Sequence, residues 1–173
     1  MKVPFLDLNR QYKIIEKPIN SAIKRVLESS FFVLGREVEN FEKKFADFVG
    51  AKYCIGVNSG TDALEISLRS VGIKSGDEVI TVSYTFIATA LSISKVGAKP
   101  VFVDIGNDYQ MNSDELEKKI NKKTKAILVV HLYGAPAPIK EIKRICKKYN
   151  LLLIEDACQA HGATVDGKKV GTF

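Results

Sequence analysis

The chain of 173 residues has no tryptophan, only two histidines and only three cysteines, Cys54, Cys146 and Cys158. The cysteines are far apart and odd in number, so they match no metal or redox spacing, and we expect reduced, mostly buried thiols and no metal site. No apolar run approaches the roughly 18 residues that a membrane span needs. The start, MKVPFLDLNRQYK, lacks the apolar core of a secretion signal. These absences predict a cytoplasmic protein that does not enter a membrane.

Two phosphate-binding motifs are also missing. The sequence contains no G-x-G-x-x-G fingerprint, which marks dinucleotide-binding folds. It contains no Walker loop either, since no Gly-Lys-Ser or Gly-Lys-Thr occurs. These two absences argue against a nucleotide cofactor.

Hydrophobic residues at 46% and charged residues at 27% are ordinary for a folded domain of this length. The net charge is +6, and lysines cluster in residues 117–125 and 140–149. A basic stripe can bind nucleic acid, but apolar residues recur at helical spacing in both segments, which favours solvated helix faces. No aromatic residue interleaves with the lysines, as a single-strand binder would require. We therefore predict no nucleic acid partner.

Periodicity divides the chain into a helical start and an alternating remainder. Apolar residues recur at helical spacing in two early segments, residues 10–28 and residues 36–49. A break is expected at Pro18 in the first of them. From residue 52, short apolar runs alternate with helical segments. The expected strands are 52–57, 77–82, 99–105, 125–130 and 151–156, and the expected helices between them are 61–71, 86–96, 114–120 and 139–149. The alternation predicts an α/β fold with a mainly parallel sheet covered by helices on both faces.

Ligands bind at the carboxyl ends of strands in such sheets, where NSGTDAL (58–64) follows the first expected strand. Gly60 permits a tight turn and close approach of the backbone to a ligand. Thr61 and Asp62 would open a helix, whose N–H groups and dipole suit a phosphate. An ordinary helix cap by Ser59 or Asp62 is the alternative.

Asp156 ends a run of apolar residues, LLLIED (151–156). A carboxylate there is costly unless a cation or donors compensate it. A ligand with a protonated ring nitrogen would do so, and a salt bridge within the chain is the alternative. Gln159 can point the same way, whereas Glu155 should point oppositely and lie outside the pocket. His161 is expected to be a structural, hydrogen-bonded histidine.

Phe86 is an aromatic residue at the turn between an expected strand and the following helix. Its ring could present a flat face on which a planar ligand stacks. Packing into the core is the alternative, and the sequence leaves both open.

At these residues the sequence resembles the DegT/DnrJ/StrS family of sugar aminotransferases. Members use pyridoxal phosphate and have the aspartate aminotransferase fold of type I. The resemblance covers nearly the whole chain, and its most specific segments are SGTDAL and EDACQAHGA. The other segments are FLDLNRQY (5–12), residues 35–58, GDEVITVSYTFIATA (76–90), GAKPVFVDI (97–105) and HLYGAPA (131–137).

The resemblance implies six cofactor-binding residues. Gly60, Thr61 and Asp62 would hold the phosphate, Phe86 would stack on the ring, Asp156 would pair with the pyridine nitrogen, and Gln159 would donate to the phenolic oxygen. An aspartate that keeps the nitrogen protonated lets the ring accept electrons. The implied activity is amino transfer from glutamate to a keto-deoxysugar on a nucleoside diphosphate, with FLDLNRQY favouring a 3-keto-6-deoxyhexose. The implied assembly is a homodimer with an active site at the interface.

The family's Schiff-base lysine follows a G-T-F-like segment in an S-F-x-x-x-K motif, and this chain ends at Phe173. Lys168 and Lys169 do not match the motif. We therefore expect an N-terminal fragment: a helical arm (1–50), a partial cofactor-binding domain (51–173), no small C-terminal domain and no catalytic residue. Such a fragment would be inactive alone and bind the cofactor noncovalently at most. The alternative is a catalytically dead binding or regulatory module that keeps recognition of pyridoxal phosphate or of a sugar nucleotide.

Overall fold

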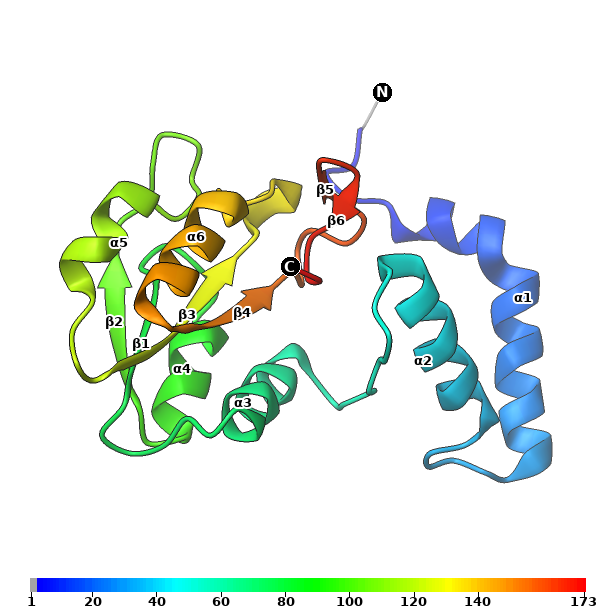
Figure 1. Ribbon diagram of the computed structural model, residues 1–173. Helices are drawn as coiled ribbons and strands as arrows, with labels where there is room; N and C mark the ends of the chain where they lie inside the picture. Colours follow the sequence, from blue (N-terminus) through cyan, green and yellow to red (C-terminus); the bar gives the residue numbers. More distant parts are fainter. Residues whose placement is uncertain (1–2) are drawn as a thin grey trace. The chain divides into compact units, whose positions relative to one another are not determined.

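The structure is a computed structural model that describes residues 3–173 (Figure 1). Its chain divides into two compact units, Met1–Phe45 and Ala46–Phe173. Each unit is described by itself. No helix among the described residues is long and apolar enough to cross a membrane.

The N-terminal unit is built from α1 (Leu8–Ser29) and most of α2 (Arg36–Val49). The Asp7 carboxylate caps α1 by accepting the Arg10 N–H. The break predicted at Pro18 is wrong, because α1 runs through it. A proline removes one hydrogen bond of the helix, and the apolar spacing of α1 continues on both sides. None of the described α1 residues is buried within the chain.

The second unit holds a four-stranded parallel sheet. The order is β2 (Lys99–Val103), β1 (Glu78–Val82), β3 (Thr124–Val130) and β4 (Leu152–Asp156). The two central strands are buried almost throughout, which explains why they are continuous apolar runs rather than alternating ones. The predicted parallel α/β fold is confirmed.

Four helices cover this sheet. They are α3 (Gly60–Ser70), α4 (Ala88–Lys95), α5 (Ser113–Lys119) and α6 (Ile139–Tyr149). The α3–α4 pair and the α5–α6 pair lie on opposite faces of the sheet (Figure 1). Helix α6 buries Ile139, Ile142 and Ile145 while its lysines stay exposed, so its basic stripe is a helix face directed away from the core. A short 3-10 helix, η1 (Leu132–Gly134), follows β3.

The strand predicted at residues 52–57 is wrong, because this segment has no regular structure. Tyr53 and Ile55 there are 74% and 81% exposed. An extended segment becomes a strand only when a neighbour takes up its backbone hydrogen bonds, and no described strand pairs with it. The sequence analysis also missed a short antiparallel hairpin whose strands, β5 (Thr164–Val165) and β6 (Lys168–Lys169), have two residues each.

Candidate functional site

A cavity of about 340 Å3 opens at the carboxyl ends of the strands. The register pairs Val130 with Asp156, so β3 and β4 end at the same level beside it. The first turn of α3 and the segment between β1 and α4 complete its wall. Five of the six predicted site residues line this cavity: Gly60, Thr61, Phe86, Asp156 and Gln159.

The sixth, Asp62, is not among the cavity-lining residues. Its N–H donates to the Ser59 hydroxyl at 3.1 Å, and its carboxylate accepts from the same hydroxyl at 3.0 Å. The ordinary helix cap that the sequence left open is therefore present. The cap leaves the N–H groups of Gly60 and Thr61 without a partner among the described residues, and both residues line the cavity. Free N–H groups at a helix start attract an anion.

The Asp156 carboxylate is oriented by the turn that follows it. Its Oδ1 accepts the Cys158 N–H at 3.1 Å. None of the ion pairs between described residues involves Asp156, so the salt bridge considered from the sequence is not formed in this part of the chain. The cavity thus contains a carboxylate that has no cation of the described chain as its partner.

The Gln159 amide has a defined orientation. Its Oε1 accepts the Tyr133 N–H at 3.1 Å. Because the oxygen is engaged by a backbone donor, the nitrogen is the end that remains to donate to a ligand. This orientation suits a ligand oxygen as acceptor.

Phe86 is 67% exposed and lines the cavity. The core position that the sequence left open for this ring is therefore excluded. Its neighbour Thr85 is tied to Thr89 by a hydroxyl contact of 3.1 Å across the first turn of α4. An exposed ring on the cavity wall can stack against a planar group.

Gly60 packs directly against Cys158. A Cβ at Gly60 would lie 3.1 Å from the Cys158 Sγ. Burial, followed by the charge of Asp156, raises the pKa of the Cys158 thiol to about 11, so the thiol is protonated at neutral pH. The sequence analysis expected mostly buried thiols, but only Cys146 is classed as buried.

Replacing Gly60 with alanine should therefore crowd the cavity. Overpacking costs roughly 1–3 kcal/mol, and we expect a cost near the lower end because the Cys158 thiol needs to shift only slightly. A binding penalty of about 1.4 kcal/mol corresponds to a tenfold loss in affinity for a phosphate-bearing ligand. The double variant Gly60→Ala/Cys158→Ala removes the thiol that the new methyl group meets, and it should recover most of the loss. Calorimetric titration with pyridoxal phosphate, the cofactor that the family resemblance implies, measures both. Equal affinities for the wild type and Gly60→Ala would contradict this steric account.

Neither candidate lysine lies at the cavity. Lys169 Nζ donates to the Phe48 carbonyl oxygen and lies 4.3 Å from the centre of the Phe48 ring. Lys168 Nζ lies 4.6 Å from the centre of the Phe173 ring. No lysine among residues 3–173 lines the cavity. The expectation that neither of these lysines serves as the Schiff-base lysine stays a prediction.

The sequence analysis missed a buried pair directly behind the site. His131 is completely buried, and its Nε2 lies 3.1 Å from the Glu155 Oε2. Its Nδ1 accepts the Ala137 N–H at 2.9 Å, which makes Nε2 the protonated nitrogen that donates to Glu155. The only sequence signal for this contact was a histidine that directly follows an apolar strand.

Glu155 also anchors the end of the described chain. It accepts the N–H of Gly171 at 2.8 Å and of Phe173 at 2.6 Å. Burial by itself would raise the pKa of Glu155, but the hydrogen bonds from His131 and from these two amides outweigh it and lower the pKa. Glu155 does not line the cavity. It therefore supports β4 from the face opposite to Asp156.

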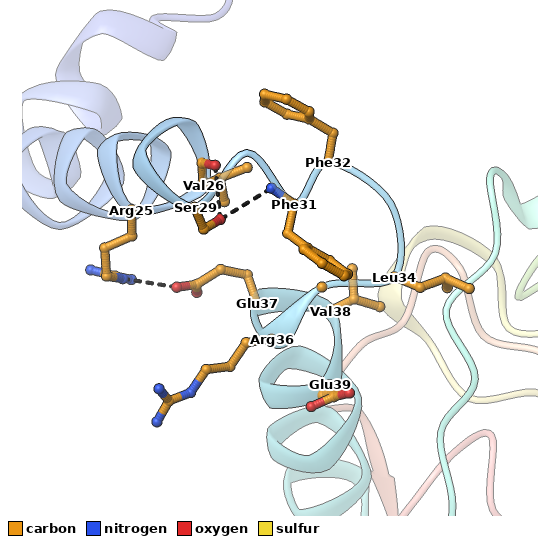
Figure 2. A pocket seen from close by; sticks show the side chains of 11 residues that line it. Arg25, Val26, Ser29, Phe31, Phe32, Leu34, Arg36, Glu37, Val38 and Glu39 are labelled. Atoms are coloured by element: carbon orange, nitrogen blue, oxygen red, sulfur yellow. Dashed lines mark hydrogen bonds and ion pairs between the residues drawn. The ribbon is translucent and has the colours of Figure 1, made fainter.

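A larger cavity, of about 630 Å3, lies within the N-terminal unit. Figure 2 shows the Arg25 side chain directed toward Glu37 there, and the two are joined by an ion pair of 2.8 Å. The Phe31 N–H donates to the Ser29 hydroxyl at 3.2 Å on the same wall. None of the predicted site residues lines this cavity. The charges of Arg25 and Glu37 on its wall compensate each other. The chemistry therefore points to the cavity at the strand ends.

Comparison with known proteins shows which family the chain resembles over almost its whole length. The profile of the DegT/DnrJ/EryC1/StrS aminotransferase family matches residues 13–173. A dTDP-3-amino-3,6-dideoxy-alpha-D-galactopyranose transaminase of Aneurinibacillus thermoaerophilus is 51% identical over 172 residues, which are 99% of this chain and 47% of that protein. The chain spans about half the length of the curated relatives it matches.

Solved structures match just as fully. The crystal structure of DesV from S. venezuelae in complex with a ketimine intermediate has a TM-score of 0.96 and 43% identity, covering 99% of this chain and 47% of DesV. The structure of NtdA from Bacillus subtilis with bound cofactor PMP has a TM-score of 0.89 and 38% identity, covering 97% of this chain and 39% of NtdA. This likeness includes the sheet whose strand ends form the cavity.

Proposed function

Because the chain belongs to the DegT/DnrJ/EryC1/StrS aminotransferase family, we propose that it forms the cofactor cradle of a pyridoxal phosphate-dependent sugar aminotransferase. The proposed reaction moves an amino group from glutamate to a keto-deoxysugar carried on a nucleoside diphosphate. The relative named above as a dTDP-amino-dideoxyhexose transaminase supports this class of substrate. A homodimer that acts in the cytoplasm is part of the same proposal.

One observation carries the proposal: the cavity offers opposite polarity at two places. The free N–H groups of Gly60 and Thr61 suit an anion, and the Asp156 carboxylate without a cation partner suits a positive group. Pyridoxal phosphate carries a phosphate and a basic ring nitrogen, so one ligand satisfies both. A Cβ at Gly60 would make a tight contact with the Cys158 Sγ, so a residue without a side chain fits this point of the cavity wall.

Each residue has a separate proposed task. When bound, the cofactor supplies an electron sink for the carbon that loses a proton. Asp156 would hold the proton on the ring nitrogen, and the Gln159 nitrogen would donate to the phenolic oxygen. Phe86 would cover one face of the ring and keep water from it. Asp62 would act through the cap that shapes the start of α3.

A second candidate function is a binding or regulatory module without catalysis. The observation that favours it is a cavity with no lysine on its wall among the described residues. Without an amine at the cavity, the cofactor would be held noncovalently, and the proton transfer on the substrate carbon would lack its base. Both candidates require the same cradle and differ in whether a lysine reaches it.

A titration of the 173-residue chain with pyridoxal phosphate, followed by absorbance, tests the cradle. We expect saturable binding, and after borohydride reduction mass spectrometry should find no adduct on Lys168 or Lys169. The chain alone should form no amino sugar from glutamate and a dTDP-linked keto sugar. Absence of saturable binding would refute the cradle, and a stable adduct or rapid amino-sugar formation would refute the noncovalent part of the proposal.

A further inference from the structure

Three tyrosines from three different loops meet at the carboxyl end of the sheet. Tyr84 follows β1, Tyr109 lies in the segment after β2, and Tyr133 lies in η1 after β3. The Tyr84 ring centre lies 5.9 Å from that of Tyr109 and 6.4 Å from that of Tyr133. The hydroxyls of Tyr84 and Tyr133 are 3.1 Å apart and hydrogen-bonded. We call these three residues the tyrosine cluster.

The tyrosine cluster is exposed although its backbone is held in a costly conformation. Tyr84, Tyr109 and Tyr133 are 44%, 55% and 68% exposed. Tyr109 and Tyr133 have φ angles of +63° and +54°. A residue other than glycine in this region costs about 1–3 kcal/mol and persists only where its surroundings fix it. Burial of these rings within the described chain does not offset that cost.

A buried glutamine fixes the two strained loops to each other. Gln110 is 2% exposed, and its Nε2 donates to the Leu132 carbonyl oxygen at 3.2 Å. Its Oε1 accepts the Leu132 N–H, also at 3.2 Å. These two bonds join the residue after Tyr109 to the residue before Tyr133. The backbone segments that carry Tyr109 and Tyr133 are therefore tied together before any ligand arrives, as in preorganised binding sites.

The tyrosine cluster borders the cavity at the strand ends. The Tyr133 N–H orients the Gln159 amide, which lines that cavity. Tyr84 directly precedes Thr85 and Phe86, which also line it. None of the three tyrosines lines the cavity itself, but the hydrogen bond to Gln159 places the Tyr133 backbone beside the cavity wall. A substrate that reaches the cofactor on the Gln159 side would meet the tyrosine cluster.

We propose that the tyrosine cluster is a stacking platform for the hexose ring of a nucleotide-linked sugar, an inference that rests on the proposed function. Aromatic faces pack against the C–H faces of a pyranose, and phenolic hydroxyls exchange hydrogen bonds with sugar hydroxyls. The hydrogen bond between the Tyr84 and Tyr133 hydroxyls raises the pKa of Tyr84, so that hydroxyl stays protonated at neutral pH. The paired hydroxyls beside the rings can exchange hydrogen bonds with the several hydroxyls that a pyranose presents around its ring, so we assign the platform to the sugar and leave the nucleobase as an outcome of the test.

Calorimetric titration of the chain saturated with pyridoxamine phosphate tests the platform, with dTDP-glucose and dTDP as the two probes. Tyr84→Ala and Tyr109→Ala should each weaken dTDP-glucose binding about three- to tenfold, the usual range for one aromatic contact. Affinity for dTDP should not change. Tyr84→Phe keeps the ring and should lose less than Tyr84→Ala. Tyr53→Ala, which removes an exposed tyrosine outside the cluster, is the matched control.

Several outcomes would overturn the platform. Equal weakening of dTDP and dTDP-glucose would assign the rings to the nucleobase. Unchanged affinity for both probes in the alanine variants, or no saturable dTDP-glucose binding by the wild type, would also refute it. Binding of pyridoxamine phosphate separates these failures from failure of the proposed function. If the wild type binds pyridoxamine phosphate, only the platform is refuted. If the wild type does not bind it, the proposed cofactor cradle is refuted. Circular dichroism confirms that each variant is folded.

Discussion

Replacing Glu155 with alanine should lower the free energy of unfolding by about 3 kcal/mol, because the change leaves several hydrogen-bond donors without an acceptor. Glu155 accepts from the fully buried His131 ring and from the amides of Gly171 and Phe173. A buried donor without an acceptor keeps the full cost of its desolvation. Since Glu155 belongs to β4, loss of these bonds should also loosen the strand that carries Asp156.

Urea unfolding followed by far-ultraviolet circular dichroism measures this loss, since the chain has no tryptophan to report it by fluorescence. Glu141→Ala, at an exposed position on α6, is the matched control and should change stability by less than about 0.5 kcal/mol. His131→Asn can keep an acceptor for the Ala137 amide in its side-chain oxygen, and its side chain is too short to place a donor where Nε2 of His131 meets Glu155. In a double-mutant cycle its effect and that of Glu155→Ala should therefore not add. Additive effects would contradict the pairing.

The same contact predicts a pH dependence. The pKa of Glu155 is lowered in the folded chain, so its carboxylate contributes stability above the ordinary carboxyl value of 4.5. That contribution should disappear as the pH falls from about 4.5 through the lower folded value. The stability difference between the wild type and Glu155→Gln should therefore be constant near neutrality and shrink in acid. If this stability difference grew on acidification, the pKa of Glu155 would be raised rather than lowered in the folded chain, which would contradict the prediction.

The sequence was sufficient for the parts of the fold in which local pattern and burial agree. The central strands are buried on both faces and read as apolar runs, and α6 has the bounds predicted from its isoleucine spacing. Asp156 was identifiable because a carboxylate at the end of such a run needs an explanation. Gly60 was a candidate because a glycine at the start of a helix lets the backbone turn tightly and approach a ligand, although an ordinary helix cap explained the same segment.

The parts that were missed depend on partners distant in the chain. Residues 52–57 have strand-forming side chains, but strand formation needs a neighbouring strand, and none of the described strands supplies one. The contact of His131 with Glu155 joins residues 24 positions apart, and no local pattern encodes it. The same holds for Gln110, whose two bonds to Leu132 become visible only once the loops are side by side. Support around a site is thus harder to derive from sequence than the residues that line it.

Replacing Asp156 with asparagine should weaken pyridoxamine phosphate binding by roughly 10- to 100-fold. A hydrogen bond to a charged group is worth about 1.5–3 kcal/mol, and asparagine keeps the shape of the side chain without its charge. The amide oxygen of the substituted side chain can still accept the Cys158 N–H, so the turn after β4 should remain intact. The variant Asp156→Ala should bind pyridoxamine phosphate at least as weakly as Asp156→Asn and should also be less stable.

The chemical shift of a 15N-labelled pyridine nitrogen distinguishes lost charge from lost structure. In the wild type the carboxylate should keep that nitrogen protonated at neutral pH, and in Asp156→Asn it should be neutral. Asp114→Asn, in the exposed first turn of α5, is the matched control and should bind as the wild type does. A protonated nitrogen in Asp156→Asn, or wild-type affinity, would mean that another group meets the ring. The uncompensated carboxylate at the end of β4 would then need a different ligand.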